Sequence, residues 1–190
     1  MTDDRVADLA RTLVDAATAG RDVSRLVRQA DHGDMEAYRD AAAAVWMANQ
    51  EPDAGPDELL VDDDALGRIV RVFRRDDALA LLYEAEQRRR APDTATASDQ
   101  AADLAGSVWD DRAELDAHLE EAATGWRVAR MAPVDRAVLR IATWELSHLP
   151  DIPTPVIISE AVRLAKAYST ERSGSFVNGV LGAVADRVRG

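Results

Sequence analysis

The sequence predicts an all-α fold. Apolar residues recur three and four positions apart along most of the chain, which is the period of one face of an α-helix. No segment alternates apolar and polar residues in the way a half-buried strand does. Glycine and proline interrupt the helical pattern at positions that suit helix ends and starts, as at Gly20, Pro133 and Pro155.

Residues 1–61 are predicted to form helices of their own. The apolar stripes indicate one helix from Val6 to Ala17, a shorter one from Val23 to Ala30, and a third from Met35 to Trp46 with Asp34 as its N-cap. Residues 49–63 contain two prolines, a glycine and many acids, so we expect a loop there. We place a domain boundary in this loop, which gives an acidic helical extension over 1–61 and a second domain over 62–190.

The second domain is predicted to begin with a long helix. Asp62, Asp63 and Asp64 suit its start, because carboxylates accept hydrogen bonds from free backbone N–H groups, and the helix should run to about Gln87. Further helices are expected near 99–110 and 112–123, from Pro133 to about His148, from Thr154 as the cap with Pro155 at the first position, and from Ser173 onward. Their apolar stripes predict that these residues are buried: Val138, Ile141, Ile158, Ala161, Val162, Ala165, Phe176, Val180 and Leu181.

Composition is that of an ordinary folded protein, with 47% hydrophobic and 31% charged residues and no cysteine. The N-terminus shows no signal-peptide pattern and no apolar run reaches the length of a membrane span, so we expect a cytoplasmic protein. The net charge is −12, but residues 1–66 contribute 16 acids and 6 arginines, or −10. The remaining 19 acids and 17 bases give only −2, which leaves room for a local basic face.

We find no pattern of catalytic or metal-binding residues. His32, His118 and His148 are scattered singly rather than at metal-ligand spacing. Residues 31–36 contain Asp, His and Glu side chains, but a turn followed by a helix cap explains them more simply than a metal cluster. We therefore predict no enzyme activity, no catalytic residue, no cofactor and no metal.

The last helix contains Gly174, Gly179 and Gly182, although glycine inside a helix costs about 1 kcal/mol relative to alanine. Close packing of a neighbouring helix, with Asn178 as a polar tether, is one explanation. A ligand that approaches the helix backbone is the other. We expect Arg140 and Glu145 to form pairs between packed helices.

Three segments together resemble the NusB family of transcription antitermination factors. They are Asp135–Arg140 continuing to Leu146, Pro153–Lys166, and the run Ser-Gly-Ser-Phe-Val-Asn-Gly-Val-Leu at 173–181. The resemblance covers about Phe73 to Val184 and leaves the first 70 residues unmatched. It implies a helical bundle of two packed subdomains that binds RNA and has no catalytic site.

The resemblance also implies site residues. NusB proteins begin with an arginine-rich helix that contacts RNA, and bound RNA lies beside the start of their last helix. Asp135 and Arg136 open the family helix that meets the protein partner, the small-subunit ribosomal protein also called NusE. The RNA-binding residues implied here are Arg68, Arg71, Arg74, Arg75, Tyr83, Arg172, Ser173, Ser175 and Phe176.

The chain departs from the family in several places. Asp76 and Asp77 stand where the family has cations, so we expect them to weaken the attraction to phosphate. The 88–98 segment is too short for the additional helix usual there, and Ser159 replaces an asparagine. The acidic residues 1–61 are extra. They either supply packing that the missing helix normally gives or fold over the arginine helix as a phosphate mimic.

The function predicted is that of a NusB-type factor. It would bind boxA-like single-stranded RNA together with NusE, in the RNA polymerase antitermination complex. Two alternatives stay open: a divergent protein-interaction module that has lost RNA binding, and a stand-alone relative of the helical front domain of ribosomal RNA cytosine methyltransferases. The sequence does not decide between monomer and dimer.

Overall fold

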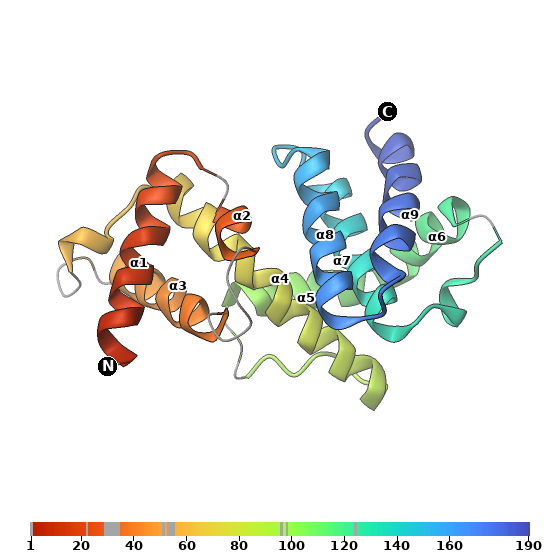
Figure 1. The fold of residues 1–190 in the computed structure, drawn as a ribbon. Helices are drawn as coiled ribbons and strands as arrows, with labels where there is room; N and C mark the ends of the chain where they lie inside the picture. Colours follow the sequence, from red (N-terminus) through yellow and green to blue (C-terminus); the bar gives the residue numbers. More distant parts are fainter. Residues whose placement is uncertain are drawn as a thin grey trace. The chain divides into compact units, whose positions relative to one another are not determined.

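The computed structural model describes residues 2–21, 23–28, 35–50, 52, 56–95, 97, 99–123 and 125–190. Every regular element in these ranges is a helix and none is a strand (Figure 1). The all-α prediction is therefore confirmed for the described part of the chain.

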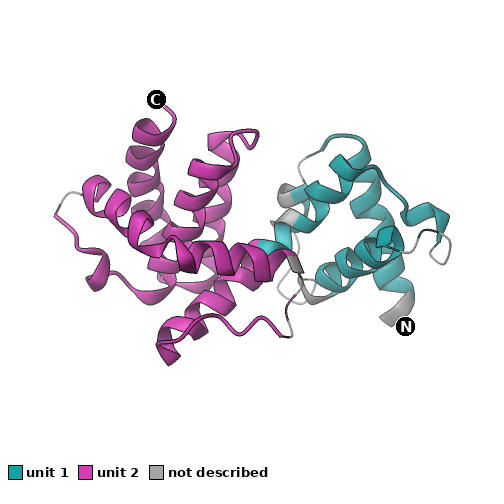
Figure 2. Ribbon diagram, turned by 180° about the vertical axis from the view of Figure 1, so that it is seen from behind, with its two compact units in different colours: residues 1–74 teal, residues 75–190 magenta. Residues whose placement is uncertain are grey.

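The chain forms two compact units, residues 1–74 and residues 75–190 (Figure 2). The division falls inside the long helix α4 (Asp63–Arg88), because the first turns of α4 contribute to the core of unit 1. The domain boundary predicted from the sequence instead lies between residues 61 and 62. Compact units are defined by packing and do not show which part folds on its own, so this domain boundary stays a prediction.

Unit 1 contains α1 (Thr2–Thr18), α2 (Val23–Arg28), α3 (Met35–Gln50), the 3-10 turn η2 (Asp57–Leu59) and the start of α4. Gly20 ends α1 with a positive φ of 67°, a conformation that glycine adopts without strain. The predicted cap Asp34 lies outside the described residues. Helices α1 and α3 pack against each other and against α4 around one apolar core, formed by Ala10, Leu13, Ala16, Ala17, Val23, Val27, Ala41, Ala42, Val45, Ala48, Leu59, Ala65, Ile69, Val72 and Phe73.

The start of α4 follows the prediction. The Asp62 carboxylate accepts a hydrogen bond from the Ala65 backbone N–H at 2.7 Å, which is the bond expected of an N-cap aspartate. Asp63 and Asp64 occupy the first turn, where the positive end of the helix dipole favours negative charge.

Unit 2 contains the rest of α4, α5 (Asp99–Asp110), α6 (Arg112–Ala122), η3 (Val128–Arg130), α7 (Pro133–His148), α8 (Thr154–Tyr168) and α9 (Ser173–Val188). Helices α7, α8 and α9 pack against one another, and α6 covers α7 and α9. One continuous apolar core joins them, and its largest fully buried side chains are Leu115, Leu119, Leu139, Ile141, Leu146, Ile157, Leu164 and Leu181.

Three details of the prediction are corrected. Thr154 does not cap α8, because the cap position is Pro153, and the Thr154 hydroxyl instead accepts a hydrogen bond from Arg189. The buried stripe of α8 is rotated slightly from the predicted one: Ile157 and Leu164 are fully buried, whereas Ile158 and Val162 are partly buried. Phe176 is also only partly buried, and its exposed part matters for the site.

None of the described helices is long and apolar enough to cross a lipid bilayer.

Candidate nucleic-acid interface

The start of α9 is held by a hydrogen-bond cluster centred on Ser173. The buried Ser173 hydroxyl donates to Asp135 Oδ2 at 3.0 Å and lies 2.8 Å from the Thr170 hydroxyl. It also accepts a hydrogen bond from the Thr170 backbone N–H at 3.2 Å. The first turn of α9 is thereby joined to the first turn of α7, where Asp135 lies.

This cluster changes the interpretation of two predicted site residues. Ser173 was expected to offer its hydroxyl to RNA and Asp135 to meet a protein partner. Asp135 is only 7% exposed, and its second oxygen, Oδ1, is buried without a hydrogen-bond donor within the described structure. The two residues bind each other, and this hydrogen bond links the start of α9 to the start of α7.

The neighbouring residues of α9 do face solvent. Arg172 and Ser175 are exposed, and the partly buried Phe176 ring packs against Trp126 with ring centroids 5.5 Å apart and planes tilted by 54°. Trp126 is 58% exposed and follows Gly125, whose positive φ of 85° turns the chain between α6 and η3. An exposed tryptophan beside an aromatic ring is a suitable surface for an unpaired base.

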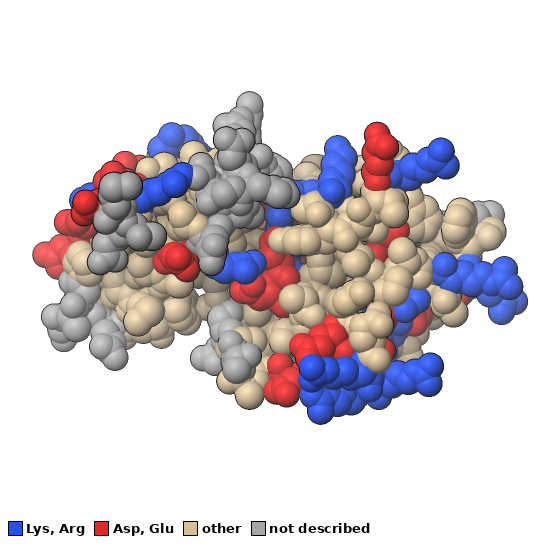
Figure 3. Space-filling view, turned by 60° about the horizontal axis from the view of Figure 1, so that its bottom comes forward, with Lys and Arg blue, Asp and Glu red and all other residues tan. Residues whose placement is uncertain are grey.

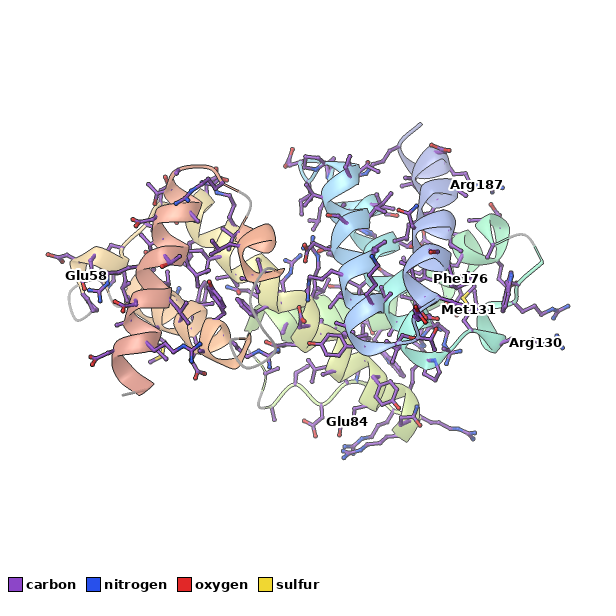
Figure 4. All side chains as sticks on the ribbon, in the orientation of Figure 1. Glu58, Glu84, Arg130, Met131, Phe176 and Arg187 are labelled. Atoms are coloured by element: carbon purple, nitrogen blue, oxygen red, sulfur yellow. The ribbon has the colours of Figure 1, made fainter. Side chains whose placement is uncertain are left out.

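Cations lie within four residues of each member of this aromatic pair in the sequence. Arg127 and Arg130 follow Trp126 in the chain, and Arg172 is the N-cap residue of α9, directly before the helical turn that contains Phe176. All three are exposed, and no side-chain carboxylate in the described ranges lies within 4.0 Å of their guanidinium groups. Figure 4 shows the Arg130 side chain extending outward from η3. We call this surface the aromatic edge, defined by Trp126, Arg127, Arg130, Arg172, Ser175 and Phe176.

Lys166 approaches the aromatic edge from α8. A Cβ atom on Gly174 would lie 2.9 Å from Lys166 Cγ and Cε, so the lysine chain crosses the first turn of α9 at this glycine. By contrast, nothing lies within 4 Å of a Cβ added at Gly179 or Gly182, and Asn178 is exposed. Close packing within unit 2 therefore explains Gly174 and does not explain the other two glycines.

Asp76 was expected to weaken the attraction of α4 to RNA phosphate, but its carboxylate is buried and paired. It is 5% exposed and binds Arg163, while the Tyr168 hydroxyl donates to Asp76 Oδ1 at 2.9 Å. Burial by itself lowers the pKa of Arg163, but hydrogen bonds to Asp76 and the charges of Asp76 and Glu160 raise that pKa above its ordinary value. The negative charge of Asp76 is thus neutralised inside the fold.

Tyr83 is exposed on α4, as an RNA contact must be. It is 42% exposed and lies seven residues after Asp76, which places both on the same helix face. Asp76 binds the end of α8, so this face of α4 is the one turned toward Tyr168.

Arg75 lies in the interior of unit 2. It is 2% exposed, and its Nε donates to the Glu145 carboxylate at 2.8 and 3.0 Å. A guanidinium that is occupied in this way does not reach a phosphate, so we leave Arg75 out of the proposed RNA-binding residues. The expectation that Glu145 pairs between helices is confirmed.

The remaining arginines of the predicted α4 stripe belong to unit 1. The Arg68 guanidinium donates twice to the Ala17 carbonyl, at 2.9 and 3.1 Å, and once to Asp64 at 2.6 Å. Arg74 is partly buried and engaged in an interaction. The backbone of Arg71 is helical, and its side chain lies outside the described structure.

Arg136 is likewise engaged inside unit 2. It binds the Glu86 carboxylate through two hydrogen bonds of 2.9 and 2.7 Å and donates to the Val128 and Met131 carbonyls. Arg140 binds Asp116 and Glu86, which confirms its expected pairing between helices. Neither arginine projects freely toward a partner.

Sequence reasoning missed Trp126, Arg127 and Arg130. They lie between the predicted helices at 112–123 and from Pro133, in a segment to which the sequence analysis assigns no function. A signal was present, because an isolated tryptophan next to glycine and arginine in a loop has no helical stripe in which to be buried.

The part of the chain that the structure describes is thus all-helical and has an exposed aromatic and basic surface at the aromatic edge; Figure 3 shows groups of Lys and Arg side chains on one face of the molecule. A family model described as the NusB family matches residues 69–186. The chain belongs to the NusB family, because the matched residues make up more than half of its length.

Individual relatives agree with this assignment. Transcription antitermination protein NusB from Arthrobacter sp. is 42% identical over 118 residues, which cover 57% of this chain and 87% of the relative. NusB from Sorangium cellulosum is 51% identical over 81 residues, covering 43% of this chain and 58% of the relative. The matched part thus spans little more than half of the length of that relative.

Solved structures show the same fold. NusB of T. maritima has a TM-score of 0.54 and 33% identity, and the match covers 61% of this chain and 90% of that one. A NusB solved as a complex of the antitermination factors NusB and NusE with double-stranded RNA has a TM-score of 0.54 and 27% identity, covering 62% and 96%. The predicted NusB-like bundle is confirmed.

Proposed function

We propose that this protein is an antitermination factor that binds single-stranded, boxA-like RNA at the aromatic edge, in the cytoplasm, as part of a transcribing RNA polymerase complex. The observation that carries the proposal is the exposed Trp126–Phe176 pair with Arg127, Arg130 and Arg172 beside it. The aromatic rings offer a stacking surface and the arginines offer phosphate contacts, which together are the usual means of binding unpaired RNA.

The aromatic edge favours unpaired RNA over a duplex. Bases in a duplex are stacked on one another, and an A-form helix is contacted mainly through its backbone and shallow minor groove. An exposed tryptophan contributes little to such contacts but stacks directly on a base that has left the helix. Family membership and the solved complex of a NusB with NusE and RNA support RNA as the ligand class.

A titration of the full chain with labelled single-stranded RNA tests the proposal. Phe176→Ala and Trp126→Ala should each weaken binding by about 1–3 kcal/mol, the usual contribution of one stacked base. Ser159→Ala is the control, because Ser159 is exposed on α8, is not part of the aromatic edge, and donates its hydroxyl to the Val156 carbonyl of its own helix. Equal affinity of all four proteins would contradict the proposal and favour a protein-interaction module.

We also propose that the NusE ribosomal protein is the protein partner. Family membership and the complex formed by a related NusB support this. Asp135 and Arg136 enter as positioning residues, since they bind Ser173 and Glu86 and thereby hold the first turn of α7. Calorimetric titration of the chain with NusE should show tight binding, and RNA affinity should rise when NusE is present. Absence of heat at micromolar concentrations would overturn this partner.

A further inference from the structure

A cleft of about 480 Å³ opens in unit 2 between the end of α4, α5, α6, η3 and the start of α7. Its size falls within the range of small-molecule sites and suffices for one nucleotide. It is distinct from the aromatic edge, but the two are adjacent along η3: Val128 and Ala129 line the cleft, and Trp126 and Arg127 immediately precede them.

The floor of the cleft is a rigid set of paired charges. Arg136 binds Glu86 at 2.7 and 2.9 Å, and Arg140 binds Asp116 through two bonds of 2.7 Å while also contacting Glu86. Burial alone lowers the pKa of Arg140, but Asp116 and Glu86 raise it above the ordinary value. The floor therefore presents fixed donors and acceptors with almost no net charge.

The rim of the cleft carries Arg89 and Arg112, which form no ion pair with a carboxylate of the cleft floor. Arg112 covers the Trp109 ring, with its guanidinium carbon 4.6 Å from the ring centroid. Arg89 lies at the end of α4, and no carboxylate in the described ranges pairs with it. The other rim charge is Glu120, whose carboxylate accepts a hydrogen bond from the Val128 backbone N–H at 2.8 Å.

Arg89 adopts an unusual backbone conformation. Its φ is +52°, while the Arg89 and Arg90 N–H groups close the end of α4 on the Glu86 and Ala85 carbonyls. Glycine is the usual residue at this left-handed C-cap position, and a larger residue there costs about 1 kcal/mol. A residue in a strained conformation that places a cation at a cleft is a candidate for a functional role.

The lining selects the kind of ligand. The paired floor has almost no net charge and the rim includes Glu120, so the cleft offers no concentrated positive charge to a compact dianion such as inorganic phosphate. A nucleotide within a strand fits better, because its base edge has both donors and acceptors for the paired floor, its flat face matches the Arg112–Trp109 stack, and its phosphodiester carries a single charge for Arg89.

We propose that this cleft receives one unpaired nucleotide of the same RNA strand that stacks on the aromatic edge. The proposal rests on the proposed function and adds a second contact point, which adjoins the aromatic edge along η3. It also gives a role to an arginine in a backbone conformation that favours glycine.

Arg89→Gly gives a test with two readouts of opposite sign. The glycine removes the cation and relieves the positive φ, so the melting temperature of the full chain should stay equal or rise. RNA affinity should fall, and the salt dependence of binding should lose about 0.7 units of slope for one phosphate contact to a single strand. Arg88→Ala is the control, because Arg88 is exposed, pairs with Glu84 at 2.7 Å and does not line the cleft.

An abasic scan of the RNA locates the nucleotide. We expect two abasic positions to weaken binding to the unaltered chain, by about fivefold or more each. One loss should disappear in Trp126→Ala and the other in Arg112→Ala. If Trp126→Ala and Phe176→Ala lower affinity while Arg89→Gly and Arg112→Ala do not, the cleft proposal is overturned and the proposed function stands. If the unaltered chain binds no RNA, both proposals fail.

Discussion

Ser173 and Asp135 show that burial, and not residue type alone, decides what a polar side chain binds. Both types commonly bind ligands, and the sequence placed them at separate surfaces. In the structure they are buried and bind each other, across 38 positions of the chain. Ser175 lies two positions further along the helix and is exposed, so its hydroxyl can reach a ligand where that of Ser173 cannot.

Ser173→Ala should therefore lower stability much more than Ser175→Ala. Removing the Ser173 hydroxyl leaves the buried Asp135 carboxylate without its donor, which costs about 1–3 kcal/mol. An exposed serine replaced by alanine changes stability by at most about 0.5 kcal/mol. Urea denaturation of the two variants measures the difference, and equal midpoints would show that the Ser173–Asp135 bond contributes nothing.

The buried pair Arg75–Glu145 makes a second prediction at this scale. Arg75→Ala should cost about 3–5 kcal/mol, because it removes the guanidinium that binds the buried Glu145 carboxylate. Arg172→Ala, at an exposed position, should leave the unfolding midpoint nearly unchanged while weakening RNA binding. The opposite result, a stable Arg75→Ala protein with impaired RNA binding, would return Arg75 to the RNA-binding residues.

At the scale of elements, the helix limits were predictable and the side-chain partners were not. Caps and breakers act locally, so Asp62, Gly20 and Pro133 marked their helix ends correctly. Partners such as Trp126 and Phe176 lie 50 positions apart and meet only through the packing of α9. Local spacing carries no information about such pairs, which is why Arg75 was assigned to the surface.

Helix α9 supplies the prediction for this scale. Gly179→Ala and Gly182→Ala should each raise stability by up to about 1 kcal/mol, because the added methyl meets open space and alanine favours the helix. Gly174→Ala should gain less, since Lys166 must move aside. Thermal melts compare the three variants.

The same variants test whether something outside unit 2 approaches these glycines. If Gly179→Ala or Gly182→Ala weakens NusE or RNA binding while raising stability, then a partner contacts the helix there. Destabilisation by either variant would contradict the open space seen around them.

At the scale of the whole molecule, residues 1–61 need a role. Their apolar stripes are buried in unit 1 against Ala65, Ile69, Val72 and Phe73 of α4. This supports the packing role over charge screening, because screening alone requires no buried stripe. The acidic net charge of residues 1–61 did not predict this role, since net charge gives no information about which side chains pack together.

Deleting residues 1–61 should expose that face of α4 and lower the melting temperature, as measured by circular dichroism. RNA affinity per folded molecule should stay unchanged at low salt. Higher affinity at low salt, with full stability, would instead show that the acidic segment screens the arginine helix.

The salt dependence of RNA binding tests the central claim most directly. Each arginine of the aromatic edge that contacts a phosphate releases counterions, so log K against log salt concentration should lose about 0.7 units of slope per arginine removed. We predict a loss of about two units for the triple variant Arg127→Ala, Arg130→Ala, Arg172→Ala, with the fold intact by circular dichroism. An unchanged slope and affinity in this variant would show that RNA does not bind at the aromatic edge.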